Sequence, residues 1–374
     1  MLDDPIETGF ALGDTAAFLV NHLVEATTFA ALVALLALLL RRSSARVRYR
    51  LLGVAAAKFF LPSALIVSLA SALGWSLPNL RSLTWSPADR LVVNGAGGAL
   101  VAALIAVWCL GAVFACCRLL RAKGQMKAWL RDSRPVESEE PVAGALAAAM
   151  RRSGLPVAPR WGHPLQARWV EGLASPAVWG LRRPYLLLPL AIDRHLSREE
   201  LDAVLLHELE HLRRRDHWAG ALQRALRVVF WFHPLVWWLD QRLLAERERA
   251  CDERVVALGG QPRHYARGLL KVVRLGIGGL RPTAMAAATA SDLERRIAQI
   301  LHGPPERSPH RWTHAAASAA VVMLLGLSVV LAGQGRCDVR LLTIDPAERL
   351  SADVDGSDVV RAACVKPPEP CMEG

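Results

Sequence analysis

Residues 205–217 read LLHELEHLRRRDH, with two histidines four positions apart in a strongly charged segment. Ser197 and Glu200 precede this stretch at the three-residue spacing of a capping box, which marks the start of a helix. Leu201 and Val204 begin an apolar side that continues at helical spacing. The stretch is therefore expected to lie on an amphipathic helix with one buried face.

On such a helix, His207 and His211 lie about one turn apart on one face, where both imidazoles can bind a single metal ion. Glu208, beside the first histidine, can take a proton from the attacking water. A helical H-E-x-x-H pattern is typical of zinc metallopeptidases, so we predict one Zn²⁺ per chain. The competing interpretation is a charge-rich surface helix that binds no metal.

Two histidines do not complete a catalytic zinc site, which normally has three protein ligands and one open position. In ERERACDERV, residues 246–255, Glu248 and Asp252 are one helical turn apart. Glu248 can supply the third ligand, and Asp252 can orient a ligand histidine. Glu246 competes with Glu248 for the ligand role. Glu210 is a poor ligand because its helix position prevents it from closing a compact site with both histidines.

Four other side chains are weaker candidates for stabilising the oxyanion of a hydrolytic reaction. His264 and Tyr265 follow the predicted ligand helix, and His217 and His233 precede it. A structural role is the competing interpretation for all four. Asp216 is expected to cap a helix or to pair with the arginines before it.

The composition favours a membrane protein, because 53% of the 374 residues are hydrophobic and the mean hydropathy is positive. Each long apolar stretch is near the ~20 residues that a helix needs to cross a bilayer. Lys58 is a charge inside the second of them, and we expect it at the membrane edge or in a helix bundle. The predicted spans are residues 16–40, 52–75, 97–117 and 314–333.

Basic segments follow the first and third spans, and the positive-inside rule places these segments in the cytoplasm. Residues 41–51 and 118–313 are then cytoplasmic, and the N-terminus and the C-terminal tail are extracytoplasmic. The acidic N-terminus does not resemble a secretory signal, so the first span is expected to be retained. The net charge of +11 is explained by these flanks, and no nucleic-acid binding is expected. Arg213–Arg215 are read as an anchor at the inner leaflet.

The segment between the third and fourth spans shows several local patterns. Short β-type runs at 167–189 suggest an antiparallel pair or meander, whose edge is also a candidate binding site for an extended peptide. Residues 218–239 are apolar but broken at His233-Pro234, which favours an interfacial or re-entrant hairpin over a full span. Gly259-Gly260 is a plausible stop for the ligand helix.

The cysteines follow the same division of the chain. There is no C-x-x-C pair, so a cysteine-based zinc ribbon is not expected. Cys337, Cys364 and Cys371 lie in the predicted extracytoplasmic tail, where one disulfide is possible.

Several of these stretches resemble one known family. LLHELEHLRRRDH, VFWFHPLVWWL and ERERACDERVVALG, in this order and spacing, resemble the membrane metallopeptidase domain of the BlaR/MecR antirepressor family. ASPAVWGLRRPYLLLP before the motif and DLERRIAQIL at 292–301 do so as well. The resemblance covers residues 165–302 well and the four-span layout more loosely.

The resemblance implies a gluzincin-like site with His207 and His211 as zinc ligands, Glu208 as catalytic base and Glu248 as third ligand. The expected fold is a mainly α integral membrane protein of four transmembrane helices, with an α+β zinc metallopeptidase domain between the third and fourth. The expected parts are a three-span region at 1–120, the cytoplasmic domain at 121–313, the fourth span at 314–333 and a short extracytoplasmic tail at 334–374.

The chain departs from the sensors of this family at its C-terminal end. Those sensors carry a large penicillin-binding domain with its nucleophile in an S-x-x-K motif. None of the five lysines here has a serine three positions before it, and about 41 residues follow the fourth span. Acylation by a β-lactam on this chain is therefore not expected.

Three functions are compatible with these patterns. The leading hypothesis is a zinc endopeptidase of the bacterial inner membrane that transmits a signal by cutting a cytosolic protein, such as a winged-helix repressor, and also itself. The second is a housekeeping quality-control metalloprotease of the HtpX kind. The third is a non-catalytic membrane receptor or scaffold with a structural zinc site.

Overall fold

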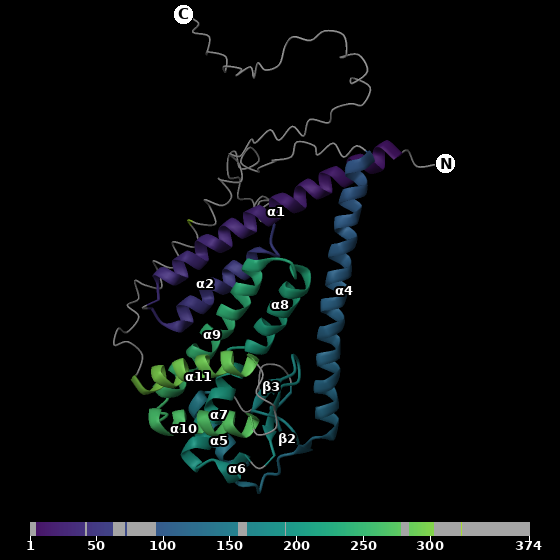
Figure 1. The fold of residues 1–374 in the computed structure, drawn as a ribbon. Coiled ribbons are helices and arrows are strands. Elements are labelled where there is room, and N and C mark those ends of the chain that lie inside the picture. The colour runs from purple at the N-terminus through teal and green to yellow at the C-terminus, as the bar shows by residue number, and fades with distance from the viewer. Residues whose placement is uncertain are drawn as a thin grey trace, which may run out of the picture. The chain divides into compact units, whose positions relative to one another are not determined.

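The computed structural model describes residues 5–41, 43–62, 95–155, 163–190, 192–277 and 284–302, and the single positions 72 and 323. The described part is mainly helical, with one small mixed sheet (Figure 1). The predicted fourth span at 314–333 and the tail at 334–374, with its three cysteines, lie outside the described residues, apart from position 323.

Two described helices are long and apolar enough to cross a membrane. α1, Pro5–Leu39, contains the candidate span Phe18–Leu39, and α4, Gly95–Asp132, contains the candidate span Ala99–Asp132. The apolar side chains of α4 are largely exposed, as expected for a helix that faces lipid. These helices coincide with the first and third predicted spans.

The second predicted span is described only in its first part. α2, Ala45–Lys58, and the turn after it belong to this stretch, and residues 63–71 and 73–75 lie outside the described part. Lys58 is buried, and its Nζ lies 3.3 Å from Oε2 of Glu25 on α1. The charge in this apolar stretch therefore faces a neighbouring helix, which was one of its two predicted placements.

The sheet contains the expected antiparallel pair, β3 (Ala177–Trp179) with β4 (Tyr185–Pro189), but it is not a meander, because β2 (Gln166–Val170) runs parallel to β4. Its order is β1 (Arg134–Pro135), β2, β4 and β3. β2 and β4 are parallel, whereas β1–β2 and β3–β4 are antiparallel. β4 is central because its three leucines are fully buried, and an apolar strand needs neighbours on both sides. β3 is consequently an edge strand, although it precedes β4 in the chain.

A group of helices covers this sheet, and we call their shared interior the sheet core. They are α5 (Pro141–Ser153), α6 (Ile192–His195), α7 (Arg198–Arg213), α10 (Pro262–Ile277) and α11 (Ala284–His302). α7 lies in its middle and contributes Leu205, Leu206 and Leu209, each fully buried. The sheet core consists of buried apolar residues, among them Val142, Trp169, Leu186, Leu188, Leu201, Val204, Val255, Tyr265, Val272 and Ile300.

The predicted broken segment at 218–239 forms parts of two helices. α8, Asp216–Val229, ends before the break, and α9 begins at Pro234 and continues to Ala257. The tryptophan that follows α8, Trp231, packs directly on α4 at Gly111, where a side chain would collide with the indole ring. α9 begins at Pro234 and ends just before Gly259, which has a positive φ. The predicted break at His233-Pro234 and the predicted stop near Gly259 are therefore confirmed.

A second interior, the bundle core, lies between α1, α2, α8 and α9 (Figure 1). α9 contributes Val236, Leu239 and Leu243 to it, and the same helix contributes Val255 to the sheet core. The middle of α9 is therefore fixed from both ends. Glu248 and Asp252 lie on this middle part, facing α7.

The capping box at the start of α7 is present as predicted. The Glu200 amide donates to Ser197 Oγ at 3.3 Å, and the Ser197 amide donates to the Glu200 carboxylate at 2.9 Å. This pair satisfies two amides that a helix start otherwise leaves without partners.

Replacing Ser197 by alanine removes this cap. We expect Ser197→Ala to lower the free energy of unfolding by about 1 kcal/mol, seen as a lower unfolding midpoint of the detergent-solubilised protein. Ser44 is the matched control, because it begins α2 without a side-chain cap. An equal loss in Ser44→Ala and Ser197→Ala would contradict the assigned role of the cap.

Candidate metal centre

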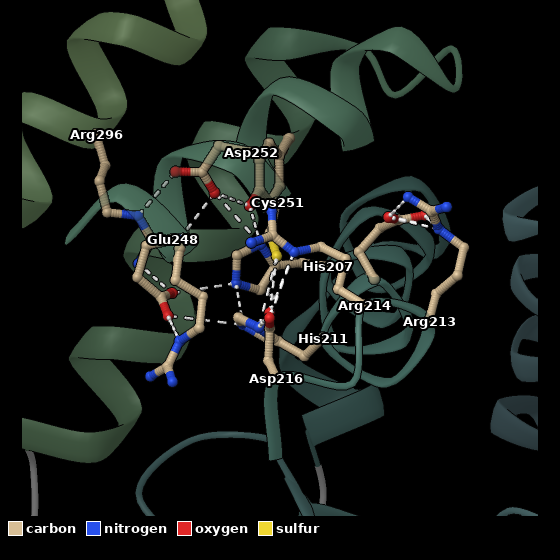
Figure 2. Close-up of polar contacts among 12 residues, drawn as sticks. His207, His211, Arg213, Arg214, Asp216, Glu248, Cys251, Asp252 and Arg296 are labelled. Carbon is tan, nitrogen blue, oxygen red and sulfur yellow. Dashed lines mark hydrogen bonds and ion pairs between the residues drawn. The ribbon is translucent and has the colours of Figure 1, made fainter. Parts of the chain in front are cut away.

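Three side chains from two helices converge between the two cores. His207 and His211 come from α7, and Glu248 comes from α9 (Figure 2). His207 Nε2 and His211 Nε2 are 3.2 Å apart, and Glu248 oxygens lie 3.3 Å from the first and 3.7 Å from the second. The ligand atoms of all three lie within 4.8 Å of one another.

These separations fit one tetrahedral metal ion. Donor atoms about 2.0–2.1 Å from a zinc ion in tetrahedral geometry are about 3.3 Å from one another. The three measured separations lie close to that value. Two imidazoles and one carboxylate also form a ligand set typical of zinc enzymes that keep a fourth position open. The residues present therefore fit such an ion.

The other nitrogen of His207 is occupied by a buried pair of side chains. Nδ1 lies 2.7 Å from the Tyr265 hydroxyl, which donates to Asp252 Oδ1 at 2.5 Å. Asp252 Oδ1 is itself 3.3 Å from Nδ1. With Nδ1–H directed to these oxygens, Nε2 keeps its lone pair for a metal. Burial alone lowers the pKa of His207, but hydrogen bonds with Asp252 and Glu248 raise it to about 10, so this pocket stabilises positive charge.

His211 is held in the same manner by a different carboxylate. Its Nδ1 donates to Oδ2 of the buried Asp216 at 2.8 Å, which again leaves Nε2 toward Glu248. Cys251 Sγ lies 3.5 Å from this Nδ1 and 3.8 Å from Asp216 Oδ2. His211, Asp216 and Cys251 form a second group with metal-ligand spacing. Burial raises the pKa of the Cys251 thiol well above its ordinary value, so its thiolate is disfavoured as a ligand.

Arg296 of α11 holds the two carboxylates of α9. Its Nε and Nη2 donate to Asp252 oxygens, each at 2.9 Å, and its Nη1 lies 3.4 Å from Glu248 Oε2. Burial alone raises the pKa of Asp252, but hydrogen bonds with His207 and Arg296 lower it to about 2. Burial likewise raises the pKa of Glu248, whereas His207, His211 and Arg296 hold it far below its ordinary value. Both carboxylates therefore remain charged.

Glu208 lies on α7 beside these groups. Burial raises the pKa of its carboxyl, and the nearby His211 and His207 act in the opposite direction. Its carboxylate makes no hydrogen bond or ion pair with another residue of the described ranges. A general base needs this combination of a raised pKa and a free carboxylate.

Other predicted residues are placed elsewhere. Glu246, the competing third ligand, is buried against Arg48 and Arg249, with nearest ion-pair distances of 2.7 and 3.0 Å. Glu210 is fully buried and paired with Arg213. Glu248 is therefore the acidic residue of α9 that the structure brings to both histidines, together with Asp252 behind His207.

Two of the four residues considered for the oxyanion, Tyr265 and His264, differ in their placement. Tyr265 is fully buried and contacts His207 at Nδ1, on the other side of the ring from the metal-facing Nε2. This position corrects the oxyanion interpretation, because the hydroxyl is engaged behind the ligand. Within the described ranges, no hydrogen bond or ion pair joins His264 to the three metal-facing side chains, and His264 Nδ1 is buried without a hydrogen-bond partner.

Two of the three arginines that were predicted to anchor the helix end at the inner leaflet are paired with acidic residues. Arg213 pairs with Glu210, and Arg214 pairs with Asp216, so both guanidiniums make contacts inside the molecule. His233 at the start of α9 contacts Thr27 Oγ1 at 2.9 Å, which is a structural role.

Three residues that the structure brings to the site had a weak sequence signal. Asp216 pairs with Arg214, as predicted, but its contact with His211 Nδ1 was not predicted. Tyr265 was considered for the oxyanion, whereas its hydroxyl contacts His207 Nδ1 and Asp252. Arg296 lies in DLERRIAQIL, and nothing in that segment alone indicates which arginine reaches α9.

The fold and the site together define a class of protein. A capped H-E-x-x-H helix that lies beside a glutamate of a second helix, with a small sheet and long apolar helices, is the architecture of a membrane-associated metallopeptidase. The sequence model described as BlaR1 peptidase M56 matches residues 17–300, which is more than two thirds of the chain. The chain belongs to this metallopeptidase family.

Individual relatives match over shorter regions. Regulatory protein BlaR1 of Bacillus licheniformis is 32% identical over 165 residues, which are 43% of this chain and 26% of the relative. Methicillin resistance mecR1 proteins of Staphylococcus aureus and Staphylococcus epidermidis are 26% identical over 103 residues, which are 27% of this chain and 18% of those relatives. The chain thus spans about a quarter or less of these relatives.

Replacing Arg296 by glutamine removes the guanidinium that pairs with both Asp252 and Glu248, and leaves Asp252 with only Tyr265 and His207 beside it. We expect Arg296→Gln to lower the free energy of unfolding of the metal-free protein by about 3 kcal/mol, because removing one partner of a buried ion pair is costly. The neighbouring Arg295 is mostly exposed and is the matched control. Chemical denaturation of both variants tests this, and Arg295→Gln should stay within about 0.5 kcal/mol of the wild type.

Proposed function

We propose that the protein is an integral-membrane zinc endopeptidase that transmits a signal by cutting a cytosolic protein. The observation that carries this proposal is the convergence of His207, His211 and Glu248 with a free Glu208 beside them. Membership of a BlaR1-type peptidase family supports it. The Bacillus licheniformis relative is a regulatory protein, which supports a signalling rather than a digestive role.

The chemistry follows from the position of each group. His207, His211 and Glu248 would hold one zinc ion, which when bound would polarise the scissile carbonyl and lower the pKa of a water. Glu208 accepts the proton of the attacking water and delivers it to the leaving amine. Asp252 and Asp216 keep the Nδ1 protons of the two histidines in place, so both Nε2 atoms face the ion. Arg296 orders the carboxylates of α9.

The proposed topology places the site at the cytoplasmic membrane face. It combines the two candidate spans of the described part with the basic residues that follow them. The metallopeptidase domain at 121–313 is then cytoplasmic, and the segment at 218–239 is an interfacial or re-entrant hairpin. The substrate is accordingly a cytosolic protein, of which a winged-helix repressor is the kind we propose, together with the chain itself.

Glu208 should be essential for cleavage but not for metal binding. We expect Glu208→Gln to lower kcat for a cleaved substrate by about 10²- to 10⁴-fold, because a positioned general base contributes a factor of this size. Zinc content, measured by elemental analysis, should stay at one per chain. Glu199→Gln, an exposed change on the same helix, is the control and should retain activity. Full activity in Glu208→Gln would refute the proposed mechanism.

Removal of the metal should abolish activity reversibly. Chelation is expected to stop cleavage, and a stoichiometric amount of Zn²⁺ should restore it. Glu248→Ala should weaken zinc affinity by more than about 100-fold, since loss of an outer partner alone costs about 10- to 100-fold. Glu294→Ala, a change at an exposed position of α11, should keep the metal. Equal zinc affinity in Glu248→Ala and the wild type would remove Glu248 from the ligand set.

The signalling function is tested in cells. Cytosolic fragments are compared by mass spectrometry between cells that produce the wild type and cells that produce Glu208→Ala. A single cleaved regulator is the expected result. Cleavage of many unrelated membrane proteins would favour a quality-control protease, and identical fragments in both strains would exclude a peptidase.

A further inference from the structure

One arginine connects α2 with the metal centre. The guanidinium of Arg214, at the C-terminal end of α7, lies over the ring of Tyr49 on α2, with its Cζ 4.8 Å from the ring centroid. Its Nε lies 3.4 Å from both carboxylate oxygens of Asp216. Asp216 accepts from His211 Nδ1, and Figure 2 shows Arg214, Asp216 and His211 grouped together. A continuous series of contacts therefore runs from α2 to a proposed zinc ligand.

The members of this series are enclosed. The side chains of Arg214 and Asp216 are 11% and 4% exposed. A guanidinium that is removed from water depends on the few groups that surround it. Within the described part of the chain these groups include the Asp216 carboxylate, the Tyr49 side chain and Cys251, and Arg214 Nη1 has no hydrogen-bond acceptor. The ring therefore contributes to fixing the guanidinium against Asp216.

Asp216 is a sensitive point in this arrangement. Its Oδ2 receives the His211 Nδ1 proton at 2.8 Å and also faces Cys251 Sγ at 3.8 Å. The orientation of this carboxylate sets the rotation of the imidazole about its own axis, and thereby the direction of Nε2. A change in how Arg214 holds Asp216 would consequently change the ligand geometry.

α2 is also fastened to the helix that bears the other ligand. Arg48 pairs with Glu246 at 2.7 Å, and the Ala45 amide donates to Glu253 at 3.1 Å. Both acidic residues lie on α9, within five positions of Glu248. α2 in turn packs on α1, which contains the first candidate span. α2 therefore packs on α9 and on one membrane-type helix (Figure 1), and it reaches the end of α7 through the contact between Tyr49 and Arg214.

We propose that Tyr49 and Arg214 are positioning residues for His211, so that the metal affinity of the centre depends on the docking of α2 against the end of α7. The proposal rests on the proposed zinc site. It gives the membrane helices a physical route to the centre: a displacement of α2 takes the ring from Arg214, loosens Asp216 and turns His211. The same protein can thus hold its metal tightly or weakly according to the position of α2.

The test uses the full-length protein in lipid nanodiscs. The dissociation constant for Zn²⁺ is measured by competition with a chelating dye, and the visible spectrum of the Co²⁺-loaded protein reports the ligand geometry. Tyr49→Leu and Arg214→Gln should each weaken zinc affinity by about 10-fold and shift the cobalt bands. Tyr49→Phe keeps the aromatic face and should stay within about twofold of the wild type.

A matched control has the same chemistry at another place. Arg134 lies over the Trp169 ring at 5.5 Å and pairs with Glu140 at 2.6 Å, but neither partner contacts a proposed ligand. Arg134→Gln should therefore leave zinc affinity and the cobalt spectrum unchanged. An effect in this variant equal to that of Arg214→Gln would show general loosening and would overturn the proposal.

A double-mutant cycle separates positioning from a structural effect. In an Asp216→Asn background, Tyr49→Leu should add less than about twofold to the loss of affinity, because its route to His211 is already broken. A full 10-fold further loss, or wild-type affinity and spectrum in Tyr49→Leu alone, overturns the proposal. Peptide cleavage is measured separately. Tight zinc binding without any cleavage would reject the proposed peptidase but leave the positioning role measurable, whereas absence of zinc binding in the wild type would reject both.

Discussion

The structure of this centre depends on two buried carboxylates that hold the Nδ1 sides of two histidines. Asp252 does so for His207, with Tyr265 between them, and Asp216 does so for His211. An imidazole is free to rotate on its helix until its second nitrogen is fixed, and it binds a metal through the nitrogen that remains. The spacing of H-E-x-x-H brings the rings near each other, but these carboxylates give both Nε2 atoms a common direction.

Buried carboxylates require compensation, and the fold supplies it from both distant and adjacent residues. Arg296 of α11, distant in sequence, neutralises Asp252 and Glu248, whereas Arg214, two positions away, neutralises Asp216. α9 is fixed in the bundle core at one end and in the sheet core at the other, so the helix that carries Glu248 cannot shift independently of either. A site between two cores is rigid. Its geometry also depends on how the sheet core and the bundle core pack against each other.

Much of the local structure was predictable from short-range rules. The capping box of Ser197 and Glu200, the break at His233-Pro234 and the stop near Gly259 all follow from the conformational preferences of a few adjacent residues. The strand order was not predictable in this way. β4, with its buried leucines, lies between β2 and β3, so these two consecutive strands do not pair with each other. The pairing of Asp216 with the arginines before it was predicted and is present for Arg214, whereas the pairing of Arg213 with Glu210 was not predicted.

The sequence by itself determined the chemistry that this protein carries: two histidines and a glutamate at a spacing that only a helix makes productive, and apolar stretches long enough for a membrane. It also determined the family, because its motifs occur in a fixed order. Only the tertiary structure decided between Glu246 and Glu248, turned Tyr265 toward the back of His207, and brought Arg296 and Asp216 to the ligands. The physical reason is that a helix fixes the neighbours of a residue three or four positions away, whereas the partner of a buried charge is set by the packing of distant helices.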